Sequence, residues 1–326
     1  MIETPVLFLV KSISNATQTV FDSILFAKPN KIYIASIILN NEKNNELISN
    51  YIESLVNQIT WKCDIKTRIE SNELNKQKLQ CETIDWYFKN EESGIIINSN
   101  FLPNKCFYSF CDDLLNHYKN DSRIMYINSL KVNDSVKAGD GSYYFSKYNQ
   151  TGAWATWKRT WLTIQPNLNN LNRALRLKTL DNVLSDKEFD YWIREFQKDD
   201  LDPSEYYNKK TLLSQWFNNG LAITPNTNLS LKIEGDFNVK KQELMSFTQK
   251  AFIETVYIKD PTFITRNKIS DEKIFQNYYN KSGFLYAIKA IKIKIKNIVN
   301  NNINIAYDKY KISNEKSMIM NRINNL

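Results

Sequence analysis

Short apolar runs alternate along the chain with longer segments in which apolar residues recur every three or four positions. The first run, Val6–Val10, is continuous, which is typical of a strand buried on both faces, and a second β-branched and aromatic run covers 31–38. Behind Asn15, a residue suited to capping a helix, apolar residues lie at helical spacing: Val20, Phe21, Ile24 and Leu25. Strand, helix and strand in this order predict a βαβ unit with a parallel pair of strands.

The same alternation continues through the first part of the chain. Helical patterns cover 42–59 and 74–89 and begin again at Pro103, and strand patterns lie between them at 61–69, 94–97 and 123–127. Strands that alternate with helices in this way predict an α/β fold, with a mostly parallel, Rossmann-like sheet flanked by helices.

Beyond residue 140 the chain becomes rich in aromatic residues. Tyr-Tyr-Phe at 143–145 and Ala-Trp-Ala-Thr-Trp at 153–157 precede several helical patterns and a short strand at 221–224. Ligands of an open α/β sheet bind at the carboxyl ends of its strands. We therefore expect the chemistry directly after the first, second and fourth strands, and in the aromatic segment 142–161.

Charge narrows the choice of partners. The chain carries 43 Lys and Arg residues against 35 Asp and Glu, for a net charge of +8 and a pI of about 9.0. Such a balance favours an anionic partner, for example a nucleotide or an acidic glycan. The lysines are scattered and no dense Arg cluster accompanies exposed aromatics, so we expect no nucleic-acid partner.

Cysteine spacing and the apolar runs indicate the cellular compartment of the protein. The four cysteines and the single histidine, His117, lack the spacing of a zinc site, which predicts reduced thiols. The run Val6–Val10 is too short for a signal peptide or a membrane span and has no basic lead-in. We expect a cytoplasmic protein.

Several ordered motifs carry a family resemblance between Pro5 and Lys232. They include Pro-Val-Leu-Phe-Leu-Val at 5–10, Gly-Ile-Ile-Ile at 94–97, Phe-Leu-Pro at 101–103, Gly-Ala-Trp-Ala-Thr-Trp at 152–157 and Asn-Asn-Gly-Leu-Ala-Ile-Thr-Pro at 218–225. The set resembles the bacterial nucleotide-diphospho-sugar transferase-like proteins of surface polysaccharide clusters, sometimes labelled haemolysin-like. The resemblance implies a GT-A glycosyltransferase fold. We predict that this domain covers 2–256 and that a helical extension follows over 257–326. The resemblance also implies transfer of a sugar from a nucleotide-sugar to a glycan or lipid-linked acceptor.

The chain departs from this family at the strand ends. The family follows its first strand with Asn-Arg-Pro, where this chain has Ser12-Ile-Ser. It ends the second with an acid that faces the nucleotide base, where this chain has Ile37. Its acid-rich Glu-Asp-Asp is replaced by Asn98, Ser99 and Asn100, and a late helical Asp by Asn208.

Loss of the acids changes the expected chemistry. Mg²⁺ and Mn²⁺ are held by carboxylate oxygens, and neutral Asn and Ser oxygens supply no charge. We therefore expect no metal and no other cofactor, and weak contact with the donor through Lys11, Ser12 and the segment 98–100. Lys11 also has the plainer interpretation of a solvated surface charge.

The candidate general base and the candidate residues for binding the sugar acceptor each have a second interpretation. If the helix start holds an insertion, Glu205 replaces Asn208 as the match to the family's acid and would act as a general base. Its alternative role is to stabilise the helix dipole. Asp140, Trp154 and Trp157 are candidates for the acceptor side, against a turn-forming role for Asp140 and a core position for at least one tryptophan.

Three functions follow for the whole chain. It is a working, metal-independent glycosyltransferase, a catalytically inactive pseudo-glycosyltransferase that partners an active enzyme, or a binding module for another anionic ligand. An apolar stripe over 285–299 with lysines beside it predicts an amphipathic helix. That helix either touches the inner membrane face or packs on its own domain.

Overall fold

The computed structural model describes residues 1–38, 45–69, 76–131, 137–164, 169–196, 203–233 and 258–279. The chain divides into two compact units, Met1–Ile274 and Phe275–Leu326. The described residues of the second unit form a short π-helix, Phe275–Tyr279. The predicted amphipathic helix at 285–299 lies outside the described residues. The division at residue 256 stays a prediction, although residues 258–274 belong to the first unit.

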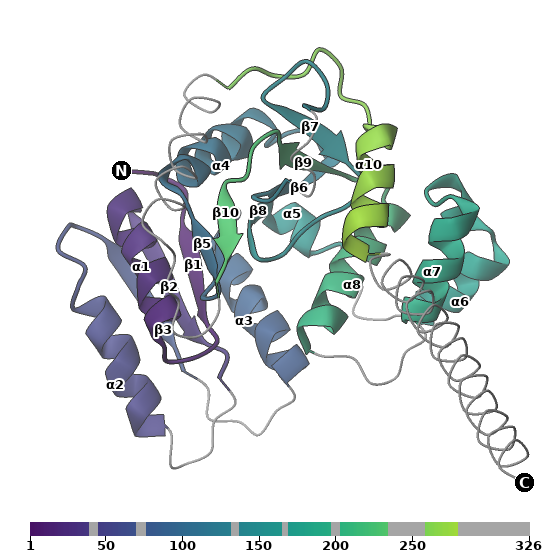
Figure 1. Ribbon diagram of the computed structural model, residues 1–326. Coiled ribbons are helices and arrows are strands. Elements are labelled where there is room, and N and C mark those ends of the chain that lie inside the picture. The colour runs from purple at the N-terminus through teal and green to yellow at the C-terminus, as the bar shows by residue number, and fades with distance from the viewer. Residues whose placement is uncertain are drawn as a thin grey trace, which may run out of the picture. The chain divides into compact units, whose positions relative to one another are not determined.

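An eight-stranded sheet forms the centre of the first unit, with the strand order β3-β2-β1-β4-β8-β6-β9-β7 (Figure 1). Its strands are β1 (Val6–Val10), β2 (Lys31–Ser36), β3 (Asp64–Arg68), β4 (Ser93–Asn98), β6 (Ile124–Asn128), β7 (Tyr143–Ser146), β8 (Ala153–Trp157) and β9 (Leu221–Pro225). β1 pairs in parallel with both β2 and β4, while β7 and β8 run antiparallel to their neighbours. The prediction of an α/β fold with a mostly parallel sheet is confirmed.

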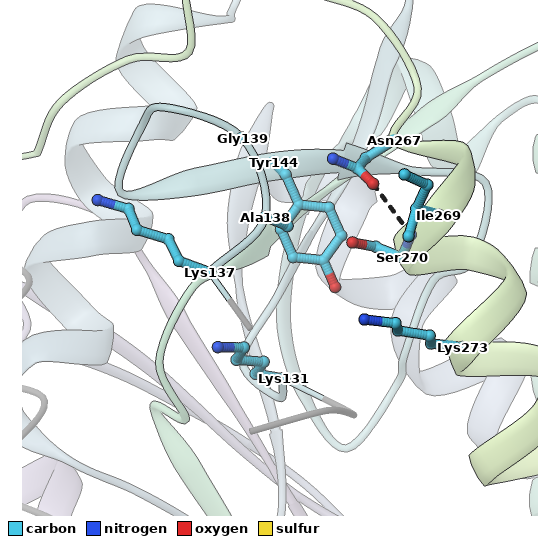
Figure 2. Close-up of a pocket in the computed structure, with 9 residues that line it drawn as sticks. All are labelled: Lys131, Lys137, Ala138, Gly139, Tyr144, Asn267, Ile269, Ser270 and Lys273. Atoms are coloured by element: carbon cyan, nitrogen blue, oxygen red, sulfur yellow. Dashed lines mark hydrogen bonds between the residues drawn. The ribbon is translucent and has the colours of Figure 1, made fainter. Parts of the chain in front are cut away.

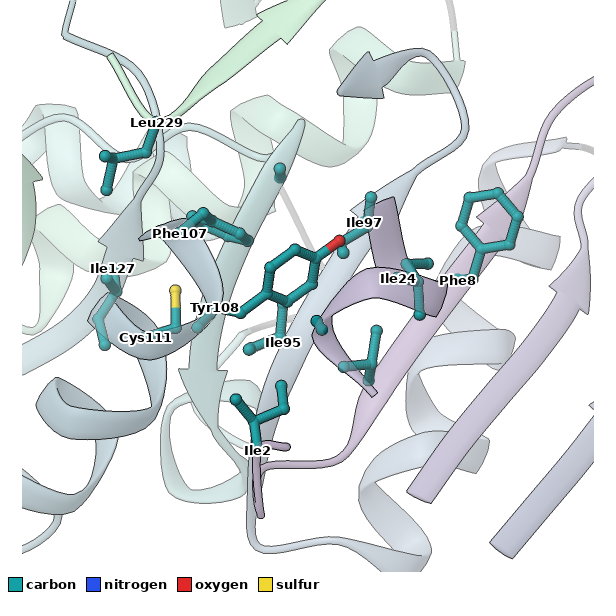
Figure 3. Close-up of a cluster of buried hydrophobic side chains, with 14 of the residues drawn as sticks. Ile2, Phe8, Ile24, Ile95, Ile97, Phe107, Tyr108, Cys111, Ile127 and Leu229 are labelled. Atoms are coloured by element: carbon teal, nitrogen blue, oxygen red, sulfur yellow. The ribbon is translucent and has the colours of Figure 1, made fainter. Parts of the chain in front are cut away.

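The apolar run of β1 is buried on both faces because its side chains alternate between two hydrophobic clusters. Val6, Phe8 and Val10 join the cluster that packs against helices α1 and α4, shown in part in Figure 3. Leu7 and Leu9 join the cluster on the other face, with side chains of α3 and α8. A two-residue period in the sequence therefore produces a sheet covered by helices on both faces.

The helices that the structure describes in the first unit are α1 (Asn15–Ala27), α2 (Asn45–Val56), α3 (Lys76–Asn90), α4 (Lys105–His117), α5 (Lys158–Trp161), α6 (Asn169–Arg176), α7 (Asp186–Phe196), α8 (Pro203–Phe217) and α10 (Lys268–Ile274). The 3₁₀ turn η2 (Thr179–Asn182) lies between α6 and α7. Within the described part of the chain, no helix is both long enough and apolar enough to cross a bilayer.

Two predicted helix starts shift in the structure. Ser14, and not Asn15, caps α1, because its side chain accepts a hydrogen bond from the Thr17 backbone N–H. Asn104 caps α4 through the N–H groups of Cys106 and Phe107, whereas Pro103 ends strand β5 (Phe101–Pro103). In both cases a side-chain oxygen meets backbone donors that the first helical turn leaves unpaired.

A small second sheet extends the region that follows β4. Strand β5 pairs in antiparallel fashion with β10 (Ser230–Lys232), and the Ile233 backbone N–H donates to the Asn100 carbonyl over 2.9 Å. The turn at Ser99 and Asn100 is therefore held from both sides, by the end of β4 and by the chain that follows β9.

Candidate functional site

The gap between β1 and β4 is the topological switch point of the sheet. From β1 the chain crosses to β2 on one side, and later it returns to β4 on the other side. Ligands of open α/β sheets bind in the crevice at such a point, beyond the carboxyl ends of the strands. The predicted donor-binding residues after β1 and at the end of β4 meet here.

Ser99 occupies the crevice between these two strand ends. Its Oγ accepts a hydrogen bond from the Lys11 backbone N–H over 3.0 Å, and its own N–H donates to the Leu9 carbonyl over 2.9 Å. Ser99 is only 1% exposed. The backbone donor that a ligand phosphate would meet first after β1 is thus already used by a neighbouring hydroxyl.

Asn98 and Asn208 are linked through a single residue, Thr151. The Asn98 Nδ2 donates to the Thr151 carbonyl over 2.7 Å, and the Thr151 hydroxyl donates to the Asn208 Oδ1. The structure therefore brings together Asn98 on β4 and Asn208 on α8, two of the positions that the sequence analysis singled out. Thr151 itself was not predicted, although it stands directly before the Gly-Ala-Trp-Ala-Thr-Trp motif that marks β8.

Two amide oxygens at this edge have no hydrogen-bond partner among the residues that the structure describes. The Oδ1 atoms of Asn98 and Asn100 are both buried without a donor. An unpaired buried polar atom costs about 1–3 kcal/mol, so water or a ligand is expected to meet it. In the loop before β8, the Asn149 Nδ2 and the Gln150 Oε1 are unpaired in the same way. The strand ends therefore offer neutral donors and acceptors.

The remaining predicted donor residues lie at the first βα turn. Ser12 is exposed, with its Oγ 3.3 Å from the Ser14 Oγ, and Lys11 is half-buried. Ile37, at the end of β2, is 7% exposed and belongs to the hydrophobic cluster of one sheet face. An apolar side chain at this place supplies no acceptor for a nucleotide base.

Helix α8 carries both candidates for the proton acceptor. Asn208 is exposed and reaches Thr151, whereas Glu205 lies three positions earlier, about one turn away on the same helix. An amide cannot take up a proton at neutral pH, and a carboxylate can. Glu205 stays a predicted base.

Both tryptophans that were candidates for sugar stacking belong to the core. Trp154 is 1% exposed and packs against the rings of Tyr126 and Tyr207 at 5.8 and 6.3 Å. Trp157 is 4% exposed, its Nε1 donates to the Leu115 carbonyl over 3.1 Å, and Arg159 lies on its ring. The acceptor role predicted for them is corrected, because protein atoms cover both rings.

Asp140 is exposed and holds another part of the chain in place. Its carboxylate accepts hydrogen bonds from the hydroxyl and the backbone N–H of Thr262, and these bonds lower the pKa of Asp140. The residue lies just before β7, whose first residue pairs with the end of β9, so it shares the carboxyl edge of the sheet. These contacts join the segment before β7 to Thr262, far along the chain, and both sequence interpretations of Asp140 stay predictions.

In the described part of the chain, carboxylates do not gather at this edge. Among the residues that the structure describes, no three His, Cys, Asp or Glu side chains stand close enough together to hold a metal ion. The oxygens that the described end of β4 presents come from amides and hydroxyls, which are weak ligands for Mg²⁺ or Mn²⁺ in the absence of a carboxylate.

Comparisons with known proteins give distant structural likenesses. No protein-family profile and no curated protein matches the sequence. Solved structures that align with the chain include a UDP-glucose pyrophosphorylase complexed with UDP-glucose, at 15% identity and a TM-score of 0.33, over 55% of this chain and 87% of that one.

Two further structures align over more of the chain. They are the 4-diphosphocytidyl-2C-methyl-D-erythritol synthase of Anaerococcus prevotii DSM 20548 (10% identity, TM-score 0.34, 76% of this chain and 98% of that one) and the inositol-1-phosphate CTP transferase of T. maritima (11%, 0.36, 77% and 98%). At these TM-scores and identities, the likenesses carry no conclusion about substrate or about the role of any residue.

Proposed function

We propose that the protein is a glycosyltransferase-like protein that binds a nucleotide-sugar at the carboxyl edge of β1 and β4 without a divalent metal. The proposal rests on the family resemblance of the sequence together with one observation. Asn98 of β4 and Asn208 of α8 lie far apart in the chain, yet Thr151 links them at the switch point where such a fold binds ligands.

Donor contact would come from neutral groups in this proposal. The unpaired Oδ1 atoms of Asn98 and Asn100 can accept hydrogen bonds from sugar hydroxyls. The phosphates would lie near Lys11 and the first turn of α1, where cationic and backbone groups favour negative charge. Without a metal, less of the charge on the leaving diphosphate is neutralised, so binding and transfer are both expected to be weak.

The reaction would exchange one bond at the anomeric carbon. The acceptor hydroxyl oxygen forms a bond to that carbon, the bond to the diphosphate oxygen breaks, and the hydroxyl proton passes to a base. Glu205 is the residue proposed for this proton, because the side chain of Asn208 cannot accept it. The acceptor is proposed to be a glycan, or a lipid-linked glycan, of surface polysaccharide synthesis.

The residues at the ends of β1, β2 and β4 favour a second function. Ser99 already bonds the Lys11 N–H, and Ile37 leaves the position of the base-binding acid apolar. Both features suit a pseudo-glycosyltransferase that has kept the scaffold and serves as partner to an active transferase. The two functions share a fold and differ in turnover.

Calorimetry distinguishes these functions most directly. The full chain would be titrated with UDP-, GDP-, CMP- and dTDP-sugars, each with Mn²⁺ and with EDTA, while release of nucleoside diphosphate is followed in parallel. Binding with release supports the transferase, and binding without release supports the inactive partner. Absence of binding to every donor contradicts both.

A matched pair of variants locates the binding. Thr151→Val removes the hydroxyl that reaches Asn208 and should weaken donor binding severalfold, since a lost hydrogen bond is worth about 1 kcal/mol. Thr163→Val removes a hydroxyl on the turn after α5, which bonds the Thr160 carbonyl, and should leave donor binding unchanged. Equal loss in both variants would place the donor elsewhere.

A further inference from the structure

A cavity lies between the β6–β7 connection and helix α10, and none of the residues named at the β1–β4 switch point lines it. It measures about 180 Å³, and its polar lining consists of Lys131, Lys137, Tyr144, Asn267, Ser270 and Lys273. Among the residues that the structure describes, no carboxylate lines it. A cavity walled by cations and hydrogen-bond donors, with no acid in the wall, favours an anion.

Several of the lining side chains lie around the Tyr144 hydroxyl. Figure 2 shows Lys131 and Lys273 on either side of the Tyr144 hydroxyl, with Ser270 above it, whereas the Lys137 ammonium points away from them. Neither Lys137 nor Lys273 forms an ion pair with any other residue described by the structure. The positive charge of the Lys273 ammonium attracts an anion that lies beside the Tyr144 hydroxyl.

The walls of the cavity are held in place by hydrogen bonds. Asn226, directly after β9, accepts from the Ala138 N–H and donates to the Ala138 carbonyl, both over 2.8 Å. The Lys131 N–H donates to the Asn228 Oδ1 over 2.6 Å, and the Ser270 N–H donates to the Asn267 Oδ1 over 2.9 Å. A cavity whose backbone is fixed in this way is formed before any ligand arrives.

The buried acid of α10, Asp271, already has an ion-pair partner and a hydrogen-bond donor. Asp271 accepts from the Arg266 Nε over 2.9 Å and from the Ser146 hydroxyl over 2.6 Å. Its negative charge is therefore directed to Arg266. Lys273 lines the cavity, so its positive charge can attract an anion there.

We propose that the cavity between Lys131 and Lys273 binds a phosphate group, at a site separate from the strand ends around Asn98. Size supports a single group, because pockets for whole small molecules measure about 300–1,000 Å³. Lysine ammonium groups and a tyrosine hydroxyl are suitable donors for phosphate oxygens. The phosphate is either a free ion or an ester carried by a sugar.

Calorimetry of the full chain tests the site with inorganic phosphate, pyrophosphate, a sugar phosphate and the matching neutral sugar. Lys273→Gln should weaken phosphate binding about tenfold, the loss expected for one hydrogen bond to a charged group, and Lys273→Arg should retain most of it. The control is Lys268→Gln, which makes the same charge change at an exposed position of the same helix outside the cavity. It should bind like the unmodified protein.

The outcomes show whether the bound phosphate is a free ion or an ester, and whether it binds in this cavity. Binding of inorganic phosphate identifies the free ion, and binding of the sugar phosphate alone identifies the ester. No binding of any phosphate, or equal losses in Lys268→Gln and Lys273→Gln, overturns the proposal. Loss of nucleotide-sugar binding in Lys273→Gln also overturns it, because the cavity would then belong to the donor site. Failure of donor binding at Asn98 leaves the phosphate result intact.

Discussion

The backbone N–H of Lys11 donates a hydrogen bond to the Ser99 Oγ over 3.0 Å and so ties the end of β1 to the turn after β4. Both groups belong to the crevice that an open α/β sheet uses for its ligand. A serine at this place therefore supports the fold and at the same time competes with a ligand for the first backbone donor after β1.

Replacing this serine separates the two effects. In Ser99→Ala the Lys11 N–H loses its partner, and we expect a loss of about 1–3 kcal/mol in the free energy of unfolding. Urea denaturation measures this loss. The control Ser12→Ala removes an exposed hydroxyl one residue after Lys11 and should stay within about 0.5 kcal/mol of the unmodified protein. Equal stability of the two variants would show that the hydrogen bond contributes nothing.

Metal dependence follows from the amides at the end of β4. Donor binding by the unmodified protein should be the same in Mn²⁺ and in EDTA, because neutral oxygens hold a divalent ion poorly. Asn100→Asp adds one carboxylate where an oxygen is already buried without a partner, and should tighten Mn²⁺ binding about tenfold. Asn120→Asp makes the same change at an exposed turn and should have no effect. Mn²⁺-dependent transfer that EDTA abolishes in the unmodified chain would contradict this prediction.

A buried ion pair anchors α7 to the end of β7. Lys147 Nζ lies 2.7 Å from Glu188 Oε1, and the two side chains are 3% and 4% exposed. Burial lowers the pKa of Lys147. Although burial opposes it, the pKa of Glu188 is also lowered, by hydrogen bonds from Lys147 and Tyr148.

Glu188→Gln would leave a buried ammonium without its counter-charge, which costs about 3–5 kcal/mol. Thermal and urea unfolding should both show the loss. Glu92→Gln breaks the exposed Lys158–Glu92 pair, where Glu92 is 85% exposed, and should cost less than about 1 kcal/mol. A small effect at Glu188 would mean that water reaches Lys147 in the variant.

The pH dependence of stability should carry a contribution from Asp271. Burial raises the pKa of Asp271 to about 6, above its ordinary value of 3.8, despite hydrogen bonding from Ser146 and the nearby charges of Arg266 and Lys147. Between these two values the folded protein binds more protons than the unfolded chain. The contribution is therefore fully present below pH 3.8 and is lost as the pH rises through about 6.

Asp271→Asn should remove this part of the pH profile, which amounts to on the order of 1–3 kcal/mol. Unfolding free energies of the variant and the unmodified protein, measured between pH 4 and pH 7, would be compared directly. Glu272→Gln alters the next, exposed residue of α10 and should keep the unmodified profile. If Asp271→Asn shows the same slope as the unmodified protein, another group causes it.

Local pattern was enough to predict most of the elements. The continuous apolar run of β1 and the helical spacing of Val20, Phe21 and Ile24 are properties of neighbouring residues, and burial depends on them directly. The sequence alone does not define the first residue of this helix, because Ser14 and Asn15 both have side chains that can cap a helix. Only the backbone at Ser14, which is extended, makes it the cap.

The candidate sites depended on contacts that no local pattern contains. The sequence predicted that Asn98 would stand at a strand end and that Asn208 would lie on a later helix. Their link through Thr151 exists because β8 pairs with β4 and brings the residues before it to the same edge. The same pairing buries Trp154, whose motif alone suited a ligand site equally well.

By itself, then, the sequence determined the α/β alternation, the strands and helices of the sheet layers, and the amide and hydroxyl side chains that follow the fourth strand. The tertiary structure decided which polar groups meet, that Ser99 occupies the crevice, and that Lys131 and Lys273 face one cavity. The physical reason is range. Burial and helix periodicity act between near neighbours in the chain, whereas a site is assembled by pairing and packing between segments far apart in sequence.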